Sequence, residues 1–257
     1  MGKMVDEAEM LYGQYDWDRY DVIVLPPSFP FGGMENPRLT FATPTIIAGD
    51  RSLVSLIAHE LAHSWSGNLV TNATWNDFWL NEGFTVYFER RIMEALYGKD
   101  YTDMLALLGF QDLTSELSSL DEDMQKLKLK LNGLHPDDAM SDIAYEKGYF
   151  FLRMLEEKKG RAKMDSFLKN YFDDHKFQTI TTEEFLAYLD QNLLQGKEDG
   201  LMINQWVYQS GLPANCPKVL SNRFVQAEKA VDVFLKKGVD NIVAVSYTHL
   251  TLPTIPG

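Results

Sequence analysis

The sequence is poor in cysteine and in long apolar runs. It has a single cysteine, Cys216, among 257 residues, which excludes an intrachain disulfide and any metal or iron–sulfur site built from several thiolates. No stretch approaches the roughly 18–20 consecutive apolar residues that cross a bilayer. The acidic start of the chain also lacks the apolar core of a secretory signal. We therefore expect a soluble, cytoplasmic protein with no membrane partner.

Positive charge is scarce as well. Lys and Arg number 24 against 37 Asp and Glu, so the formal net charge is −13. A surface of this sign repels phosphate groups, which argues against nucleic acid as a partner. The apolar fraction of 45% and the charged fraction of 24% are typical of a globular protein that can bury a sizeable core.

The residue pattern predicts a small N-terminal β part followed by a mostly helical body. The first fifty residues indicate extended segments separated by turns, with a β-branched run at 20–25 and a glycine loop at 31–37. From about residue 51 the apolar residues recur at helical spacing, after a cap at Asp50 or Ser52. Further helices are expected over 76–97, 101–120, 143–159, 162–174, 182–195, 201–209 and 222–237, with Thr181 and Glu184 forming a capping box before the helix at 182–195. The alternating leucines and lysines at 127–131 fit either an edge strand or an extended linker.

His59, Glu60 and His63 form an H-E-x-x-H pattern on the first of these helices. Side chains four residues apart leave a helix on the same face, so both imidazoles can bind one ion. Glu60 lies about 100° round the helix from His59, which suits a carboxylate that acts as a general base beside the ion without binding it. The pattern therefore predicts a hydrolytic zinc centre with Glu60 as a catalytic residue.

A catalytic zinc ion takes three protein ligands and keeps one position open. Glu82 follows His63 by 82 − 63 = 19 positions, on the next predicted helix. Its neighbours are large and apolar, which indicates a buried face where an unpaired carboxylate is costly. We therefore predict one Zn²⁺ per chain, bound by His59, His63 and Glu82.

H-E-x-x-H followed by a glutamate within Asn81-Glu82-Gly83 resembles the gluzincin aminopeptidases of peptidase family M1. The upstream loop Gly32-Gly33-Met34-Glu35-Asn36 matches that family's exopeptidase signature. Blocks at 25–37, 65–72, 78–83, 145–148 and 210–213 are similar to the branch that contains leukotriene A-4 hydrolase. The resemblance covers about residues 12–215.

The resemblance implies a fold and a division of the chain. It predicts an α+β, thermolysin-like zinc metallopeptidase catalytic domain over residues 1–215. Residues 216–245 would form a helical segment that leads toward a further helical domain, and residues 246–257 a non-native or truncation tail. Full-length members of the family also carry a β-rich domain before the catalytic domain and a helical domain after it, and we expect both to be absent from this chain.

The resemblance also implies site residues. It predicts a zinc-dependent aminopeptidase acting on peptides with a free N-terminus, whose α-amino group binds Glu35. Gly32, Gly33 and Met34 would form the rest of this substrate-binding loop, where a carboxylate is a good acceptor for an ammonium group. Tyr145 matches the tyrosine that stabilises the transition state in the family.

Other activities remain open at this point. Asp137 matches an aspartate linked to epoxide opening in leukotriene hydrolases and is a further candidate for substrate binding. However, Met140 replaces a tyrosine and Ala144 a proline of that pattern. The alternatives are an endopeptidase that needs no amine anchor, a leukotriene-type epoxide hydrolase, and a zinc-bound but inactive fragment. Glu89, on nearly the same helix face as Glu82, would be either a hydrogen-bond partner of a ligand histidine or a surface carboxylate.

Overall fold

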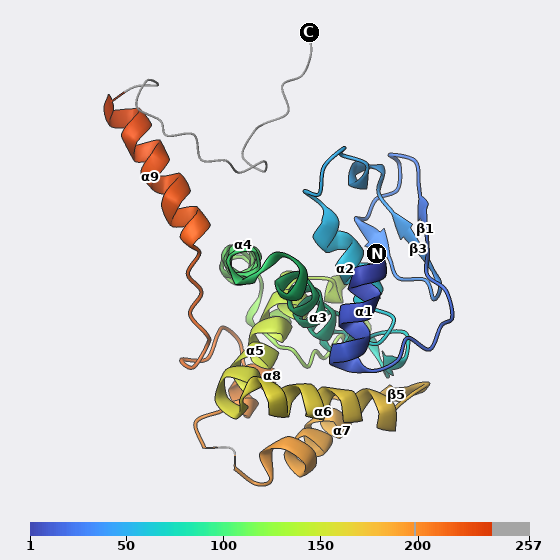
Figure 1. Cartoon of the computed structure of the whole chain (residues 1–257). Helices are drawn as coiled ribbons and strands as arrows, with labels where there is room; N and C mark the ends of the chain where they lie inside the picture. Colours follow the sequence, from blue (N-terminus) through green and yellow to red (C-terminus); the bar gives the residue numbers. More distant parts are fainter. Residues whose placement is uncertain (198, 238–257) are drawn as a thin grey trace.

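One long helix forms the centre of the molecule. The computed structural model describes residues 1–197 and 199–237. In it, α3 (Trp79–Tyr97) is surrounded by α2 (Val54–Ala62), α4 (Lys99–Leu117) and α5 (Gly148–Lys159) (Figure 1). Fourteen of its 19 residues are buried. A helix buried on nearly every side belongs to the core of a domain, and this one also carries a predicted zinc ligand.

The chain begins with a helix, α1 (Gly2–Tyr12), that packs on α2, α3 and α6 (Arg161–Asp174). The prediction that the first fifty residues are extended was wrong for this segment. Its buried residues, Met4, Ala8 and Tyr12, are spaced by four positions and lie on one helix face. The apolar spacing for a helix was therefore present in the sequence ahead of Gly13, whose φ of +105° ends it.

Two small sheets lie beside the helices. The first has the strand order β1-β3-β2, in which β1 (Asp21–Val24) runs parallel to β3 (Leu39–Ala42) and β2 (Gly33–Met34) runs antiparallel to it. The second pairs β4 (Val70–Asn72) with β5 (Gln178–Ile180) in parallel, with Val70 opposite Gln178. Part of the predicted glycine loop is thus a short edge strand, which fixes its position against the sheet.

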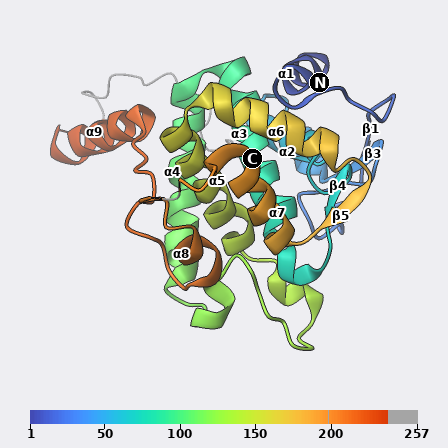
Figure 2. The same ribbon diagram turned by 90° about the horizontal axis from the view of Figure 1, so that it is seen from below.

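The C-terminal half completes the helical body. α6 crosses α3 and packs on α5, and α7 (Thr182–Leu189) follows it, as Figure 2 shows from below. The capping box is confirmed: Glu184 N donates to Thr181 Oγ1 at 3.2 Å, and Thr181 N donates to Glu184 Oε2 at 2.8 Å. After α8 (Ile203–Tyr208), the helix α9 (Asn222–Lys237) contacts α4 and projects from the body (Figure 1). None of the described helices is both long and apolar enough to cross a membrane.

Some predicted boundaries differ from the structure. α2 begins at Val54 without a side-chain cap, so neither Asp50 nor Ser52 caps it. A 3-10 turn over Trp75–Asp77 precedes α3, where the prediction had the helix itself begin at residue 76. Residues 127–131 form a linker and not a strand; their leucines are buried, and Lys128 N and Leu129 N donate to the carbonyl groups of Val207 and Asn76.

Candidate active site

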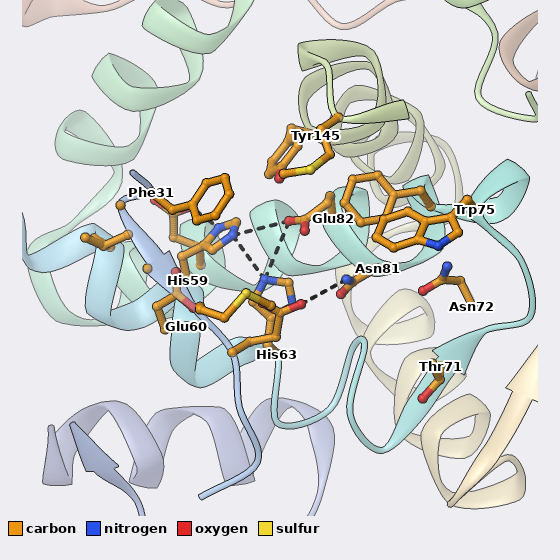
Figure 3. A pocket seen from close by; sticks show the side chains of 18 of the residues that line it. Phe31, His59, Glu60, His63, Thr71, Asn72, Trp75, Asn81, Glu82 and Tyr145 are labelled. Carbon is orange, nitrogen blue, oxygen red and sulfur yellow. Dashed lines mark hydrogen bonds and ion pairs between the residues drawn. The ribbon is translucent and has the colours of Figure 1, made fainter. Parts of the chain in front are cut away.

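Three candidate ligand atoms converge between α2 and α3. His59 and His63 lie on the last turn of α2 and at its end, and Glu82 lies on the first turn of α3 (Figure 3). The two imidazole Nε2 atoms are 3.2 Å apart, and Glu82 Oε2 is 3.4 Å from His59 Nε2 and 3.5 Å from His63 Nε2. Zinc bonds of about 2.0–2.1 Å in a tetrahedral centre place ligand atoms about 3.3–3.4 Å apart. The three atoms therefore match one face of such a tetrahedron.

The opposite ring nitrogens are engaged with acceptors. His59 Nδ1 lies 3.2 Å from Glu89 Oε2, and His63 Nδ1 lies 3.0 Å from the carbonyl oxygen of Ser66. A neutral imidazole whose Nδ1–H donates to such an acceptor directs its Nε2 lone pair at the point that Glu82 also faces, which suits a metal ligand. The contact of Glu89 with His59 corresponds to the first of the two alternatives weighed for Glu89, whereas Ser66 was not predicted as a site residue.

Ser66 also joins the two helices that supply the ligands. Its Oγ lies 2.9 Å from the carbonyl oxygen of Leu80 and 2.8 Å from that of Asn81, just before Glu82 on α3. Glu82 Oε2 is buried and has no hydrogen-bond partner among the described residues. A buried carboxylate oxygen without a donor is costly unless a cation lies beside it. Together with the spacing of the ligand atoms, this orphan oxygen fits a zinc ion.

The three ligand residues line a cavity of about 790 Å³ that is strongly acidic. Five carboxylates line it, and none of the described lining residues is Lys or Arg. The carboxylates are those of Glu35, Glu60, Glu82, Glu89 and Asp137. Such a concentration of negative charge favours cations, both a metal ion and the ammonium group of a substrate.

Glu60 lies on the inner wall of this cavity. Its Oε2 atom is buried without a hydrogen-bond partner among the described residues. Burial raises the pKa of Glu60 to about 7, although His59 and His63 act in the opposite direction. A Cβ atom at Gly33 would collide with the Glu60 carboxylate. Only glycine therefore allows the edge strand β2 to approach this side chain so closely.

Glu35 is held in place by two asparagines. Asn81 Nδ2 donates to Glu35 Oε1 at 3.1 Å, and Asn68 Nδ2 donates to the Glu35 carbonyl oxygen at 2.7 Å. Burial alone would raise the pKa of Glu35, but His63, the Glu35 backbone N–H and the hydrogen bond from Asn81 outweigh burial and lower it. Glu35 Oε1 lies 4.0 Å from His63 Nδ1. An ionised carboxylate is thus fixed beside the ligand residues.

The two asparagines were missed as site residues by the sequence analysis. Their only signal was their position inside two family-like blocks, at 65–72 and 78–83. Asn81 also depends on Gly67, whose φ is +103° and where a Cβ atom would collide with Asn81 Oδ1. Gly32, Gly33 and Met34, which were expected near Glu35, do line the cavity.

Tyr145 faces the same cavity from a π-helical turn, Ile143–Lys147, that precedes α5. Its ring stacks on His59 with the ring centroids 6.2 Å apart and the planes inclined by 14°. Burial and the nearby carboxylate of Glu82 raise the pKa of Tyr145. Its hydroxyl is therefore a neutral hydrogen-bond donor close to the ligand residues (Figure 3). The sequence predicted a helix here but not its π-helical start.

Asp137 has a different position from the other candidate residues. It lines the cavity, but its side chain is 73% exposed, and its Oδ2 lies 3.4 Å from His135 Nδ1. It follows Pro136 on a short 3-10 turn, Pro136–Ala139. The structure thus places Asp137 at the rim, away from the buried carboxylates around His59 and His63.

A helix pair that presents two histidines and a glutamate to one point in an acidic cavity defines the catalytic domain of a metallohydrolase. The model of the peptidase family M1 domain matches residues 3–206 of the chain. The chain therefore belongs to peptidase family M1, which confirms the expected family. The expected fold, an α+β metallopeptidase catalytic domain, is confirmed by the solved structures that it matches.

Curated relatives are similar over most of this chain. Leucine aminopeptidase 2 of Sclerotinia sclerotiorum is 47% identical over 219 residues, which are 82% of this chain and 36% of that protein. The leukotriene A-4 hydrolase homolog of Botryotinia fuckeliana is 45% identical over 82% of this chain and 34% of that protein. The chain thus spans about a third of the length of these relatives.

Solved structures agree with this assignment. The structure of yeast LTA4 hydrolase in complex with bestatin matches with a TM-score of 0.87 and 41% identity, over 91% of this chain and 38% of that one. An M1 zinc metallopeptidase from Deinococcus radiodurans matches with a TM-score of 0.67 and 26% identity, over 85% of this chain and 45% of that one. The fold is therefore shared beyond the more similar relatives.

Proposed function

We propose that this chain is the catalytic domain of a zinc-dependent aminopeptidase, which removes N-terminal residues from peptides. The observation that carries the proposal is the triangle of His59 Nε2, His63 Nε2 and Glu82 Oε2, with separations of 3.2, 3.4 and 3.5 Å. These residues would bind one zinc ion. When bound, zinc supplies Lewis-acid chemistry, which polarises a carbonyl group and makes a bound water more acidic.

Glu35 would bind the free α-amino group of the substrate. Its carboxylate is oriented by Asn81 and lies 4.0 Å from His63 Nδ1. An ammonium group bound there brings the first peptide carbonyl close to the ligand residues, since only two covalent bonds separate the two groups. The acidic cavity favours a charged amino end over an acylated one. This requirement distinguishes the proposed exopeptidase from an endopeptidase.

Glu60 and Tyr145 would move and donate protons. The buried Glu60 Oε2 has no hydrogen-bond partner among the described residues, so it is available to accept a proton from the attacking water and return it to the leaving amine. The Tyr145 hydroxyl would donate a hydrogen bond to the carbonyl oxygen as negative charge develops on it. Both side chains line the same cavity as Glu35.

The remaining cavity walls favour an apolar substrate side chain. They include Phe31, Leu56, Trp75, Phe78 and Met140. These residues support apolar over charged first residues in the substrate. Epoxide hydrolysis is less well supported, because Asp137 is exposed at the rim and paired with His135.

Two further expectations stay predictions. One is the cytoplasmic location. The other is the division of the chain at 1–215, 216–245 and 246–257. Of these ranges, residues 238–257 lie outside the described part of the chain.

The test compares the zinc-loaded chain with its Glu60→Gln variant on a panel of aminoacyl-anilides, with and without a chelator. We expect hydrolysis of leucyl and phenylalanyl anilides that the chelator stops. Glu60→Gln should lower turnover by at least about 100-fold and keep the zinc content, whereas His63→Ala should lose the metal. The matched control is Glu157→Gln. Glu157 is an exposed residue of α5 that forms an ion pair with Arg153.

Two outcomes would contradict the proposal. The first is a Glu60→Gln variant that works at nearly the full rate, which would exclude Glu60 as the general base. The second is equal hydrolysis of free and N-acetylated peptides of one sequence, which would favour the endopeptidase. Turnover of a leukotriene-type epoxide that persists after Glu60→Gln would instead favour the epoxide hydrolase.

A further inference from the structure

Lys147 is a fully buried lysine that the proposed chemistry does not use. It belongs to the block at 145–148, and its relative exposure is 0%. Its Nζ donates to the carbonyl oxygens of Gln125 at 2.7 Å and Gln209 at 2.8 Å. It forms no ion pair with any residue that the structure describes. An isolated ammonium group is costly to bury, and burial accordingly lowers the pKa of Lys147 to about 7. An apolar side chain of similar length would fill this space without that cost.

The two carbonyl groups belong to segments outside the regular helices and strands. Gln125 ends a short turn after α4, and its side-chain Nε2 donates to the carbonyl oxygens of Leu117 and Leu120 at 3.1 and 2.8 Å. Its Oε1 accepts from Gly211 N at 3.0 Å. Gln209 and Gly211 lie next to and within the block at 210–213. Lys147 Nζ thus joins two family-like blocks that are more than sixty residues apart in the sequence.

The neighbours of Lys147 are fastened at other points. Glu146 accepts hydrogen bonds from Arg90 of α3 at 2.8 and 2.6 Å, and a Cβ atom at Gly109 of α4 would collide with its carboxylate. Gly148 lies against Gly83, where a Cβ atom would be 2.7 Å from the Gly148 Cα. The three residues that follow Tyr145 are therefore each held by contacts with a different part of the chain.

These contacts surround a conformation that needs support. The residues Ile143–Lys147 form a π-helical turn, a rare conformation that occurs mostly as single turns within α-helices and frequently at functional sites. An α-helix advances by about 100° per residue. A π-helical turn contains more residues than an α-helical turn. Relaxation of residues 143–147 to regular α-helix would therefore change the direction in which Tyr145 leaves the helix axis and move it away from the ring of His59.

We propose that Lys147 is a positioning residue for Tyr145. Its Nζ holds the π-helical turn against the backbone of Gln125 and Gln209 through these two hydrogen bonds, and this keeps the Tyr145 hydroxyl directed at the ligand residues. The inference rests on the proposed function, in which Tyr145 donates to the developing oxyanion. It adds that the donor is fixed from behind by a buried lysine that itself never touches the substrate.

The first experiment measures the Lys147→Met variant of the zinc-loaded chain on an aminoacyl-anilide. We expect kcat to fall by at least about tenfold, because small displacements of a catalytic group are costly, while KM and zinc content stay unchanged. The matched control is Lys159→Met. Lys159 lies at the far end of α5, and its Nζ donates to the carbonyl oxygen of Lys197 at 3.0 Å; this control should keep full kcat.

A double-mutant cycle with Tyr145→Phe separates positioning from general damage. If Lys147 acts through Tyr145, the double variant has the kcat of Tyr145→Phe alone. Multiplication of the two losses would overturn the inference. If Tyr145→Phe itself keeps full activity, the proposed role of Tyr145 fails, and the inference fails with it. If Lys147→Met does not fold, Gln125→Met replaces it in the cycle, because it removes the side-chain bonds that hold one of the two carbonyl segments.

A crystal structure of zinc-loaded Lys147→Met gives a readout that is independent of activity. The expected result is a Tyr145 ring that has left its stacked position on His59, with residues 143–147 relaxed toward α-helix. An unmoved Tyr145 and an intact π-helical turn would overturn the inference. This readout does not depend on activity, so a lack of turnover in the unaltered zinc-loaded chain would count against the proposed function separately.

Discussion

Under the proposed function, single carboxylates decide which substrates this site can accept. Glu35 is fixed by Asn81 and Asn68, and the contacts around it keep it ionised. Because the cavity has no Lys or Arg among its described lining residues, no cationic side chain there competes for the Glu35 carboxylate. A substrate ammonium group is therefore its best remaining partner.

The Glu35→Ala variant tests this role. An ionic hydrogen bond of this kind contributes about 1.5–3 kcal/mol, so activity on free-amino substrates should fall by at least about tenfold with unchanged zinc content. Glu35→Gln is the matched variant, since it keeps the shape of the side chain but removes the charge. Steady-state kinetics on a leucyl-anilide provide the measurement, and unchanged kcat/KM in both variants would return Glu35 to an ordinary turn carboxylate.

For individual residues, the sequence predicted the candidate metal ligands but missed the residues that form hydrogen bonds around them, and the reason is physical. His59 and His63 share one helix face, so their spacing alone determines their common direction. The partners of the site, Ser66, Asn68 and Asn81, depend on how α2 packs against α3. No periodicity along the chain encodes that packing, so the position of these residues in two family-like blocks did not reveal their contacts.

Among the helices, the start of α3 is fixed by a buried aspartate. Asp77 has a relative exposure of 0%, and its Oδ1 accepts from Lys128 Nζ at 2.6 Å and Thr182 N at 2.8 Å. Its Oδ2 accepts from Thr74 Oγ1 at 2.6 Å. Burial alone would raise the pKa of Asp77, but these donors outweigh burial and lower it. Asp77 thereby connects the turn before the ligand Glu82 to α7.

The Asp77→Asn variant should lose about 3 kcal/mol of stability near neutral pH, because it breaks a buried charged pair. A pKa lowered by folding stabilises the protein fully above the unfolded-state value of about 4, and this stabilisation is lost as the pH falls through the folded-state value. The difference in free energy of unfolding between the two proteins should therefore shrink below about pH 4. Urea unfolding at pH 7 and pH 3 measures it.

A difference that is the same at both pH values would contradict the assigned role of Asp77. The control is Glu183→Gln, which removes the other partner of Lys128. The side chain of Glu183 is 54% exposed, and exposed pairs contribute about 1 kcal/mol or less. This control should therefore change the stability only slightly at either pH.

Helices with clear apolar spacing were predictable, whereas special turns were not. The capping box at Thr181 and the helix at 162–174 follow from local residue types, and the structure confirms them. The π-helical turn before α5 arises from contacts of Glu146 and Lys147 with distant segments. Local sequence therefore predicts a helix there but not the turn that aims Tyr145.

For the molecule as a whole, repulsion among the carboxylates of the acidic site lowers the stability of the fold, and a bound cation would reduce this repulsion. The ligands come from two helices, and the five carboxylates of the cavity repel one another when no cation is bound. We expect a chelator to lower the melting temperature and added zinc to restore it. A ligand at 100 times its Kd stabilises by about 2.7 kcal/mol.

Thermal unfolding with chelator, with zinc and with both measures this effect. His63→Ala, which lacks one ligand, should respond to zinc far less than the unaltered chain. Equal melting temperatures for the chelated and zinc-loaded protein would show that the metal is not coupled to the fold.

The adjacency of Asn81 and Glu82 on α3 has a consequence for how a peptide is degraded. The first orients the carboxylate that would hold the amino end, and the second faces the point where the carbonyl would react. Two neighbouring residues of the enzyme would thus fix the distance between the bound amino group and the reacting carbonyl group at one substrate residue. Under the proposed assignment each cut exposes a new amino end that binds in the same way. A peptide would then be shortened in single steps, and partial digestion would yield a ladder of products that differ by one amino acid.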